Sequence, residues 1–208
     1  MQQFNKLIEF RQAIYDRALT RVRDAQFELV DALLLSAPIH TFPELSCSPI
    51  FRRQWPSAYA AVEDGRQDRE WLERYLAQQL PPDGCLVFSL DGTPWPHTAA
   101  RTMPDRQYVH SASDTGLSVP VVVGHPYSVL AWALERNTSW ALPLSIRRVP
   151  SQKTEVEVGV DQVKQLCRDR QAEMLQAFHL VVADGKYGNH CFLGPLKEEP
   201  CGVLVRMR

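Results

Sequence analysis

The spacing of hydrophobic residues predicts that the first part of the chain is helical. No proline or glycine occurs between Phe4 and Leu35, and apolar side chains recur there at steps of three, four and seven residues, which places them on one face of a helix. A second amphipathic stretch runs from Asp68 to Leu80. The prolines between these two stretches, Pro38, Pro43 and Pro49, exclude one continuous helix.

The pattern changes to that of β-strands after the sequence Pro81-Pro82-Asp83-Gly84. Cys85–Leu90 is a short, almost wholly apolar run that ends at Asp91, as is typical of a strand buried on both faces. Gly92–Gln107 follows with three prolines and no periodicity, so we expect a long loop there. We place the domain boundary at residue 82, where the helical pattern ends.

Two further strands are predicted in the middle of the chain. Val119–Leu134 is apolar at most positions, which indicates an inner strand, and we expect a bulge near Gly124–Pro126. Trp140–Val149 alternates in polarity, and Pro143 cannot donate a hydrogen bond to a neighbouring strand, so this strand is expected at an edge of the sheet.

A helix and two more strands are predicted after them. The helix is expected over Val156–Phe178, followed by a buried strand, His179–Ala183, that ends at Asp184. The chain stops inside a third apolar run, Gly202–Arg208, so we expect it to be truncated. The order of elements predicts an α/β protein, with a helical N-terminal region over residues 1–82 and an incomplete mixed β-sheet domain over residues 83–208.

Composition and charge exclude several classes of protein. The 23 Lys and Arg against 24 Asp and Glu give a net charge of −1, so no global basic field indicates nucleic-acid binding. No membrane span is expected, because the longest apolar stretch is interrupted. The five cysteines form no close pair, and reduced thiols in a cytoplasmic protein are expected. His190, Cys191 and Cys201 lack the spacing of a zinc site.

Two aspartates follow buried strands and are the main candidates for chemistry. A right-handed crossover through the predicted helix would lay the strand before Asp184 parallel to the strand before Asp91. If those strands are neighbours, both carboxylates lie at one end of the sheet and can hold a hard cation. The alternative is that each Asp-Gly pair only closes a turn.

An ordered series of short motifs gives a resemblance to a known family. The segments are LDGTPWPHTAARTMPDRQYVH, PVVVGHPYS, SWALPLSIRRVP, VVADGKYGN and GVLVRMR. In this order and spacing they resemble the DDE transposases of bacterial insertion sequences, most clearly from Gly84 to Arg208. Each motif alone is weak, whereas the ordered series is strong.

The resemblance implies an RNase H-like fold and a role in DNA transposition. It makes Asp91 and Asp184 the first two acids of a catalytic triad that holds Mg²⁺ or Mn²⁺ for cleavage and strand transfer at double-stranded transposon ends, with a homodimer on paired ends. The family's third acid, a Glu beyond the last strand, has no counterpart. Glu198 and Glu199 precede that strand and are not assigned. We therefore expect this chain to be inactive alone, and the alternative is a non-catalytic DNA-binding or assembly remnant.

Several other residues are weighed as minor candidates. His97, Arg101 and Arg106 lie in the expected loop beside Asp91 and are candidates for DNA phosphate contacts, with solvated loop residues as the alternative. Tyr187 either lines a DNA groove or packs under the following connector, and His125 is expected to be a hydrogen-bonded core histidine. Asp114-Thr115-Gly116 is interpreted as a turn. No P-loop or GxGxxG occurs, so no nucleotide cofactor is expected.

Overall fold

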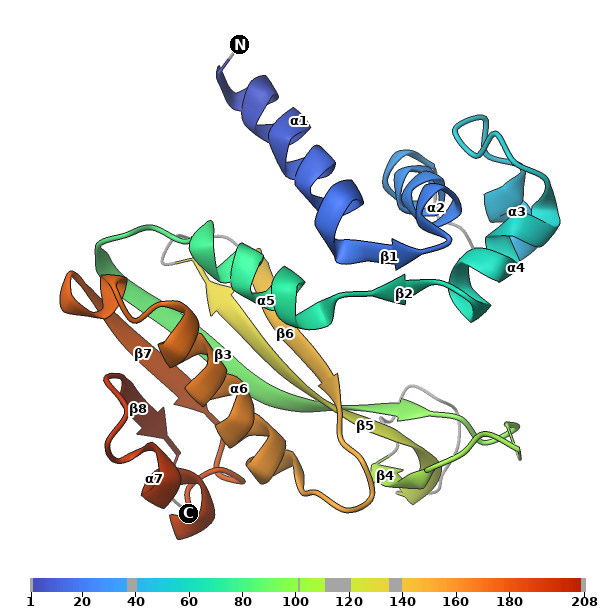
Figure 1. Cartoon of the computed structure of the whole chain (residues 1–208). Coiled ribbons are helices and arrows are strands. Elements are labelled where there is room, and N and C mark those ends of the chain that lie inside the picture. Colours follow the sequence, from blue (N-terminus) through green and yellow to red (C-terminus); the bar gives the residue numbers. More distant parts are fainter. Residues whose placement is uncertain (1, 37–40, 101, 111–120, 135–139, 207–208) are drawn as a thin grey trace. The chain divides into compact units, whose positions relative to one another are not determined.

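The computed structural model describes residues 2–36, 41–100, 102–110, 121–134 and 140–206. The chain forms two compact units, Met1–Tyr75 and Leu76–Arg208 (Figure 1). The side chains of Ala77 and Leu80 belong to the hydrophobic core of the second unit. The sequence-based boundary at residue 82, and a DNA-binding role for the helical region before it, stay predictions.

The first unit is helical, as the sequence predicts. Its elements are α1 (Gln2–Ala13), a π-helical turn (Ile14–Ala18), β1 (Leu19–Arg21), α2 (Arg23–Leu35), α3 (Phe42–Ser46), α4 (Trp55–Glu63), β2 (Arg66–Gln67) and α5 (Arg69–Gln78), which continues into the second unit. The expected unbroken helix to Leu35 is wrong, because β1 interrupts it. There the backbone pairs with β2, and Val22 adopts a left-handed conformation with φ of 52°.

The core of the first unit consists mainly of small and aliphatic side chains. Its buried members are Ala25, Leu29, Ala32, Leu45, Phe51, Ala58 and Ala61. Alanines on α2 and α4 allow these helices to pack closely. Gly65 follows α4 and has no room for a side chain, because a Cβ there would clash with the backbone oxygen of Ala61.

The second unit is built on a mixed six-stranded sheet. Its strands are β3 (Gly84–Pro96), β4 (Gln107–His110), β5 (Val121–Ala133), β6 (Ala141–Arg148), β7 (Ala177–Ala183) and β8 (Gly202–Val205), and its helical elements are α6 (Glu155–Asp169), a 3₁₀ turn (Glu173–Leu175) and α7 (His190–Leu196). The strand order is β4-β5-β3-β7-β8, with β6 also beside β5. The pairs β3–β7 and β7–β8 are parallel and the others antiparallel. This confirms the expected α/β class, with a helical region followed by a mixed sheet.

The sheet differs from the sequence-based expectation around Asp91. The long loop expected from Gly92 begins later, because β3 continues to Pro96 in unbroken pairing with β5. The bulge expected near Gly124–Pro126 is wrong for the same reason, since Pro96 pairs with Gly124 and each following residue keeps register. The irregularity lies instead between β5 and β6, after Leu130. The expected edge position of β6 is confirmed, because among the strands that the structure describes β6 pairs only with β5.

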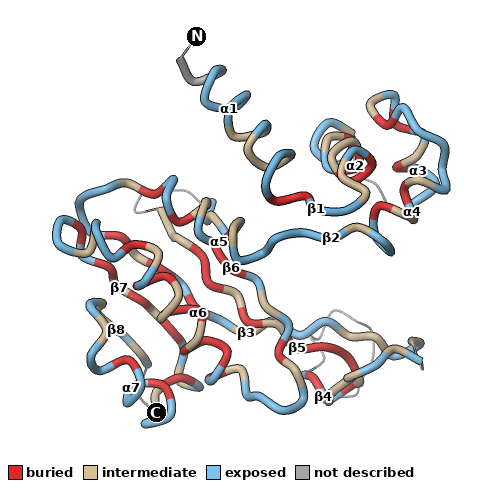
Figure 2. Tube along the Cα trace, in the orientation of Figure 1, coloured by how far each residue is buried: buried red, intermediate tan, exposed pale blue. Residues whose placement is uncertain are grey.

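Helix α6 covers one face of the sheet and closes the main core. It contacts β3 and β5, and its buried side chains pack with the alternate residues of β3 and β7 that face it (Figures 1 and 2). It ends at Asp169, earlier than the expected Phe178, which lies in β7. Just after this end, the buried side chain of Arg170 donates hydrogen bonds to the backbone oxygens of Ala77 in α5 and of Leu80 and Pro81 after it. Among the described residues, no helix has the length and apolar character needed to span a bilayer.

Candidate functional site

The two aspartates singled out in the sequence lie on neighbouring parallel strands, Asp91 within β3 and Asp184 directly after β7. Leu90 of β3 is the register partner of Ala183 of β7, and each aspartate is the next residue along its strand. Both Asp91 and Asp184 are exposed to solvent. Because neighbouring strands lie about 4.8 Å apart, the two carboxylates emerge at the same end of the sheet. We predict a separation of about 4 to 8 Å between the two carboxylates, because two-metal sites place their ions about 3.5–4 Å apart.

Each aspartate is oriented by hydrogen bonds to the backbone beside it. Asp91 Oδ1 accepts from the N–H of Gly92 at 2.8 Å. Asp184 Oδ1 accepts from the N–H of Lys186 at 2.9 Å, and the backbone oxygen of Asp184 accepts from the N–H of Tyr187 at 3.1 Å. The second aspartate therefore also builds a turn, so the turn and the ligand interpretations are compatible.

A third carboxylate reaches this end of the sheet from α6. Glu155 is the first residue of that helix, and its carboxylate forms an ion pair with Lys186, two residues after Asp184. It also lies directly against Gly92, where a Cβ would come within 2.7 Å of Glu155 Cδ. Glycine at this position leaves room for the carboxylate beside the backbone that follows Asp91.

The sequence analysis missed Glu155 by one residue, because it started the helix at Val156. The signal that fixes the start is a capping box, in which the Thr154 hydroxyl accepts from the N–H of Glu157 at 3.2 Å and the Glu157 carboxylate accepts from the N–H of Thr154 at 2.7 Å. A crossover helix between parallel strands runs antiparallel to them. Its first turn therefore lies at the carboxyl ends of the strands, where the aspartates are.

Tyr187 is a buried residue that follows Asp184 by three positions. Its side chain is fully buried and packs against Phe192 of α7 at a ring-centroid distance of 5.0 Å, which confirms the packing interpretation. Among the described residues its hydroxyl has no hydrogen-bond partner, and the nearby Ser128 hydroxyl donates to Gln162 instead. Burial raises the pKa of Tyr187, the three carboxylates raise it further, and Ser128 opposes the shift. The negative charges of Glu155, Asp91 and Asp184 therefore all disfavour ionisation of the buried Tyr187 hydroxyl.

The minor candidates fall in different places. His125 is buried, and its Nε2 lies 3.1 Å from the backbone oxygen of Pro104, which confirms a hydrogen-bonded core histidine. His97 follows β3 and its N–H donates to the backbone oxygen of Val123 at 2.8 Å. Arg106 is half-buried just before β4. Arg101 and the segment Asp114-Thr115-Gly116 lie outside the described residues.

The histidine and the cysteines considered for a zinc site lie in two different places. His190 Nε2 and Cys191 Sγ are 3.4 Å apart at the start of α7, whereas Cys201 lies beside Cys167. A hydrogen bond with Cys201, together with burial, raises the pKa of the Cys167 thiol. In the described part of the chain, no three His, Cys, Asp or Glu side chains converge tightly enough to hold an ion. The acidic end of the sheet therefore offers carboxylates that are near one another without forming a closed cage.

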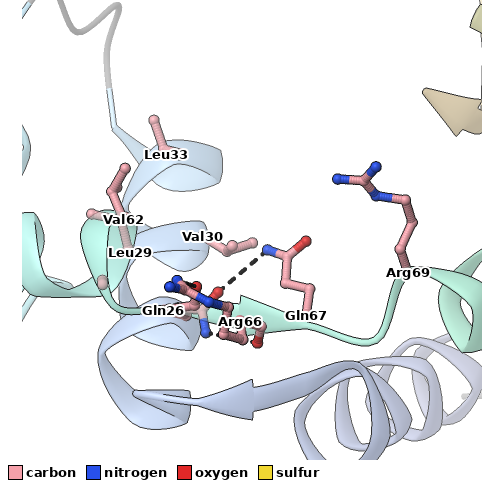
Figure 3. A pocket seen from close by; sticks show the side chains of 10 residues that line it. Gln26, Leu29, Val30, Leu33, Val62, Arg66, Gln67 and Arg69 are labelled. Carbon is pink, nitrogen blue, oxygen red and sulfur yellow. Dashed lines mark hydrogen bonds between the residues drawn. The ribbon is translucent and has the colours of Figure 1, made fainter. Parts of the chain in front are cut away.

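A separate hollow lies in the first unit, between α2, α4 and β2 (Figure 3). Its volume is about 490 Å³, and its lining is Gln26, Leu29, Val30, Leu33, Ala61, Val62, Gly65, Arg66, Gln67 and Arg69. Gln67 Nε2 donates to Gln26 Oε1 at 3.3 Å across it. The lining holds no carboxylate, histidine or cysteine, so it has no group for acid–base or nucleophilic chemistry.

Comparison with known proteins identifies the family to which the chain belongs. No curated protein matches the chain. The family profile described as DDE superfamily endonuclease matches residues 10–208, which include both compact units almost entirely. Because this match extends over nearly the whole chain, the protein belongs to the DDE superfamily endonucleases.

Proposed function

We propose that this endonuclease-family protein is a transposase, or the N-terminal part of one, that binds transposon-end DNA for metal-dependent phosphodiester cleavage and strand transfer. The observation that carries the proposal is the placement of Asp91 and Asp184 after register-matched residues of the parallel strands β3 and β7. Open sheets of this kind bind ligands at the carboxyl ends of their strands. The second unit then corresponds to the RNase H-like catalytic domain that the sequence resemblance implies.

The side chains at this end of the sheet fit a hard divalent cation. Asp91 and Asp184 supply carboxylate oxygens, the donors that Mg²⁺ and Mn²⁺ prefer, and both are open to solvent and substrate. Such an ion, when bound, polarises the phosphodiester and activates the attacking hydroxyl. Two like charges held close together repel each other, so a cation also relieves the repulsion between these carboxylates.

Glu155 is our candidate for a third acid within this chain. Its contacts with Gly92 of β3 and with Lys186 after β7 bring a carboxylate beside the backbone next to both aspartates, on the face of β3 opposite to the Asp91 side chain. Lys186 forms an ion pair with this carboxylate. The resemblance places the family's third acid beyond the last strand instead, so Glu155 would supply this charge from a different element.

The alternative is a non-catalytic DNA-binding or assembly remnant of a transposase. The absence, among the described residues, of three converging ligand side chains favours it. In that case the chain would bind transposon ends, as a homodimer on paired ends, without cutting them. The helical first unit, residues 1–82 in the sequence-based division, is our candidate for end recognition.

The experiment compares the wild-type protein with Asp91→Asn and Asp184→Asn for Mn²⁺ binding, end-DNA binding and nicking of a supercoiled plasmid that carries candidate ends. Asp161→Asn is the matched control, because Asp161 is a surface acid on α6 that pairs with Lys153. We expect Mn²⁺ binding, followed by calorimetry, to need both site aspartates and to survive in the control.

The cleavage result separates the two interpretations. Nicking that disappears in both site variants supports catalysis by this chain and overturns the expectation that it is inactive alone, and Glu155→Gln then tests the third acid. End-DNA binding without nicking supports the assembly remnant. A protein that binds no DNA, or binds Mn²⁺ equally well without either aspartate, contradicts the proposal.

A further inference from the structure

The strand that carries Asp91 also carries an exposed group of aromatic rings. β3 and β5 pair without a break from Val87 to Pro96, so side chains alternate regularly between the two faces of this ribbon. Asp91, Thr93 and Trp95 therefore lie on one face. The register adds Tyr127, which pairs with Thr93, to the same face.

Trp95, His97 and Tyr127 form what we call the aromatic ledge. The Trp95 ring is nearly parallel to His97, with an interplanar angle of 16° and centroids 5.9 Å apart. Tyr127 flanks Trp95 at the same centroid distance. His97 in turn rests against the buried ring of His125, at 5.3 Å. The Trp95 side chain is thus held in place, yet it is 60% exposed.

An exposed tryptophan fixed in this way can bind a planar partner at little entropic cost. The Trp95 ring already packs against His97 and Tyr127, so few side-chain rotations are lost on binding. Pro94 and Pro96 flank Trp95, and their rings restrict the backbone on each side of it. Stacking on such a ring does not depend on sequence, because every nucleobase has a π-face.

The surroundings of the aromatic ledge are suited to a nucleic acid. Arg148 of β6 pairs in register with Tyr127, and Asp105 holds its guanidinium at 3.2 Å. A cavity of about 330 Å³ lies along the same face beyond His97, lined by Met103, Arg106, Gln107, Tyr108 and Val123. Its volume is at the lower end of the range for small-molecule pockets, and Tyr108 at its rim is 83% exposed.

The distance along β3 relates the aromatic ledge to the candidate metal site. Trp95 lies four residues after Asp91, which corresponds to about 14 Å at 3.4 Å per residue. One strand of B-form DNA advances by about the same 3.4 Å per nucleotide. A base that stacks on Trp95 is then on the order of four nucleotide steps from a phosphate at Asp91.

We propose that the aromatic ledge stacks an unpaired nucleobase of the DNA whose phosphodiester is held at Asp91 and Asp184. This inference rests on the proposed function. It adds a second binding site, separate from the carboxylates, that binds a nucleobase only where base pairing near the reacting phosphate is lost. The partner is DNA with an unpaired nucleotide at its end, because inside a paired duplex both faces of each base are already stacked.

The test measures binding of the full chain to a blunt duplex and to the same duplex with a short 3′ tail that carries 2-aminopurine. Binding is followed by fluorescence anisotropy at low salt, where phosphate contacts give affinity for any sequence. Stacking is followed separately, by quenching of the 2-aminopurine fluorescence. The variants are Trp95→Ala and Trp95→Phe. Trp140→Ala is the matched control, because Trp140 is 79% exposed beside the opposite end of β6.

We expect the wild-type protein to bind the tailed duplex about tenfold more tightly than the blunt one, which corresponds to about 1.4 kcal/mol, and to quench the probe. Trp95→Ala should lose this preference and the quenching while its affinity for the blunt duplex is unchanged. Trp95→Phe should keep most of both, and Trp140→Ala should match the wild type. Unchanged blunt-duplex binding also shows that the variants are folded.

Two results would overturn the inference, and they can be told apart from a failure of the proposed function. Equal affinity of the wild-type protein for blunt and tailed DNA contradicts the aromatic ledge alone. A Trp95→Ala variant that keeps the preference for the tail contradicts it in the same way. A wild-type protein that binds neither duplex removes the proposed function and, with it, the basis of the ledge.

Discussion

Replacing Arg170 with methionine should destabilise the second unit strongly, although the residue is far from the acidic end of the sheet. The guanidinium is 1% exposed and donates to three backbone oxygens: those of Ala77 at 3.1 Å, Leu80 at 3.3 Å and Pro81 at 2.6 Å. A hydrogen bond from a charged group contributes about 1.5–3 kcal/mol, so these three amount to roughly 5–9 kcal/mol.

Part of this contribution is offset by the cost of burying the guanidinium. That cost is several kcal/mol per ion, and burial also lowers the pKa of Arg170. Methionine removes the cost and retains the apolar stem, but it leaves three backbone oxygens without their donor, two of them on the buried residues Ala77 and Leu80. We therefore expect a net loss of about 2–4 kcal/mol in the free energy of unfolding of the second unit.

Hydrogen exchange of β7 amides is the appropriate assay, because it reports the stability of the second unit without requiring two-state unfolding of the whole chain. Arg168→Met is the matched control. Arg168 lies two residues earlier, is exposed and donates only to Gln165 Oε1 among the hydrogen bonds described for it, so we expect a change below about 0.5 kcal/mol. An Arg170→Met variant as stable as this control would refute the argument.

Three further predictions concern the buried polar groups of the second unit. Burial lowers the pKa of His179 below its usual 6.5, with Arg170 acting in the same direction and Glu173 against it. The contribution of His179 to stability is therefore complete above pH 6.5 and is lost as the pH falls below that value. The urea midpoint of the wild type should show this pH dependence, and that of His179→Gln should not. Tyr187→Phe removes a buried hydroxyl without a partner among the described residues. It should leave the free energy of unfolding unchanged or raise it by up to about 1 kcal/mol, which a melting temperature no lower than that of the wild type would show. Gln162→Leu leaves the buried hydroxyls of two serines without their amide partner and should cost about 2–4 kcal/mol in urea unfolding, whereas a loss below 0.5 kcal/mol would show that water replaces the amide.

The apolar residues Val203, Leu204 and Val205 of the last strand predict exposed apolar surface and association of the chain in solution. Of these three, Leu204 is 57% exposed, whereas Val203 and Val205 pack partly against the core. Phe178 of β7 is also 57% exposed. The apolar exposure is therefore real but extends over neighbouring strands rather than following β8 alone.

The local pattern of the sequence determined the class of the fold and the two aspartates. Period and composition alone separate the helical region from the strands, because side-chain spacing reflects the geometry of each element. The crossover rule then predicts that β7 runs parallel to β3, and the structure confirms this orientation and makes the two strands neighbours. Asp91 and Asp184 could be found in this way because each directly follows an apolar run in the sequence, although β3 itself continues past Asp91.

Other features depended on partners that are distant in the sequence. β3 extends past Asp91 only because β5 pairs with it as far as Pro96, and a run that contains prolines has no such signal of its own. The aromatic ledge exists because that pairing brings Tyr127 beside Trp95. Helix α6 ends at Asp169, and Arg170 just after it finds its hydrogen-bond acceptors about ninety residues earlier in the chain.

Glu155 shows most clearly which features the local sequence determines and which depend on tertiary packing. The sequence contains the capping box that starts α6, so its position on the helix was determined locally. Its approach to Gly92 and Lys186 was not, because no spacing along the chain measures the distance between a helix end and two strand ends. Packing of α6 on the sheet decides that distance, since the core fixes how the helix lies across β3 and β5.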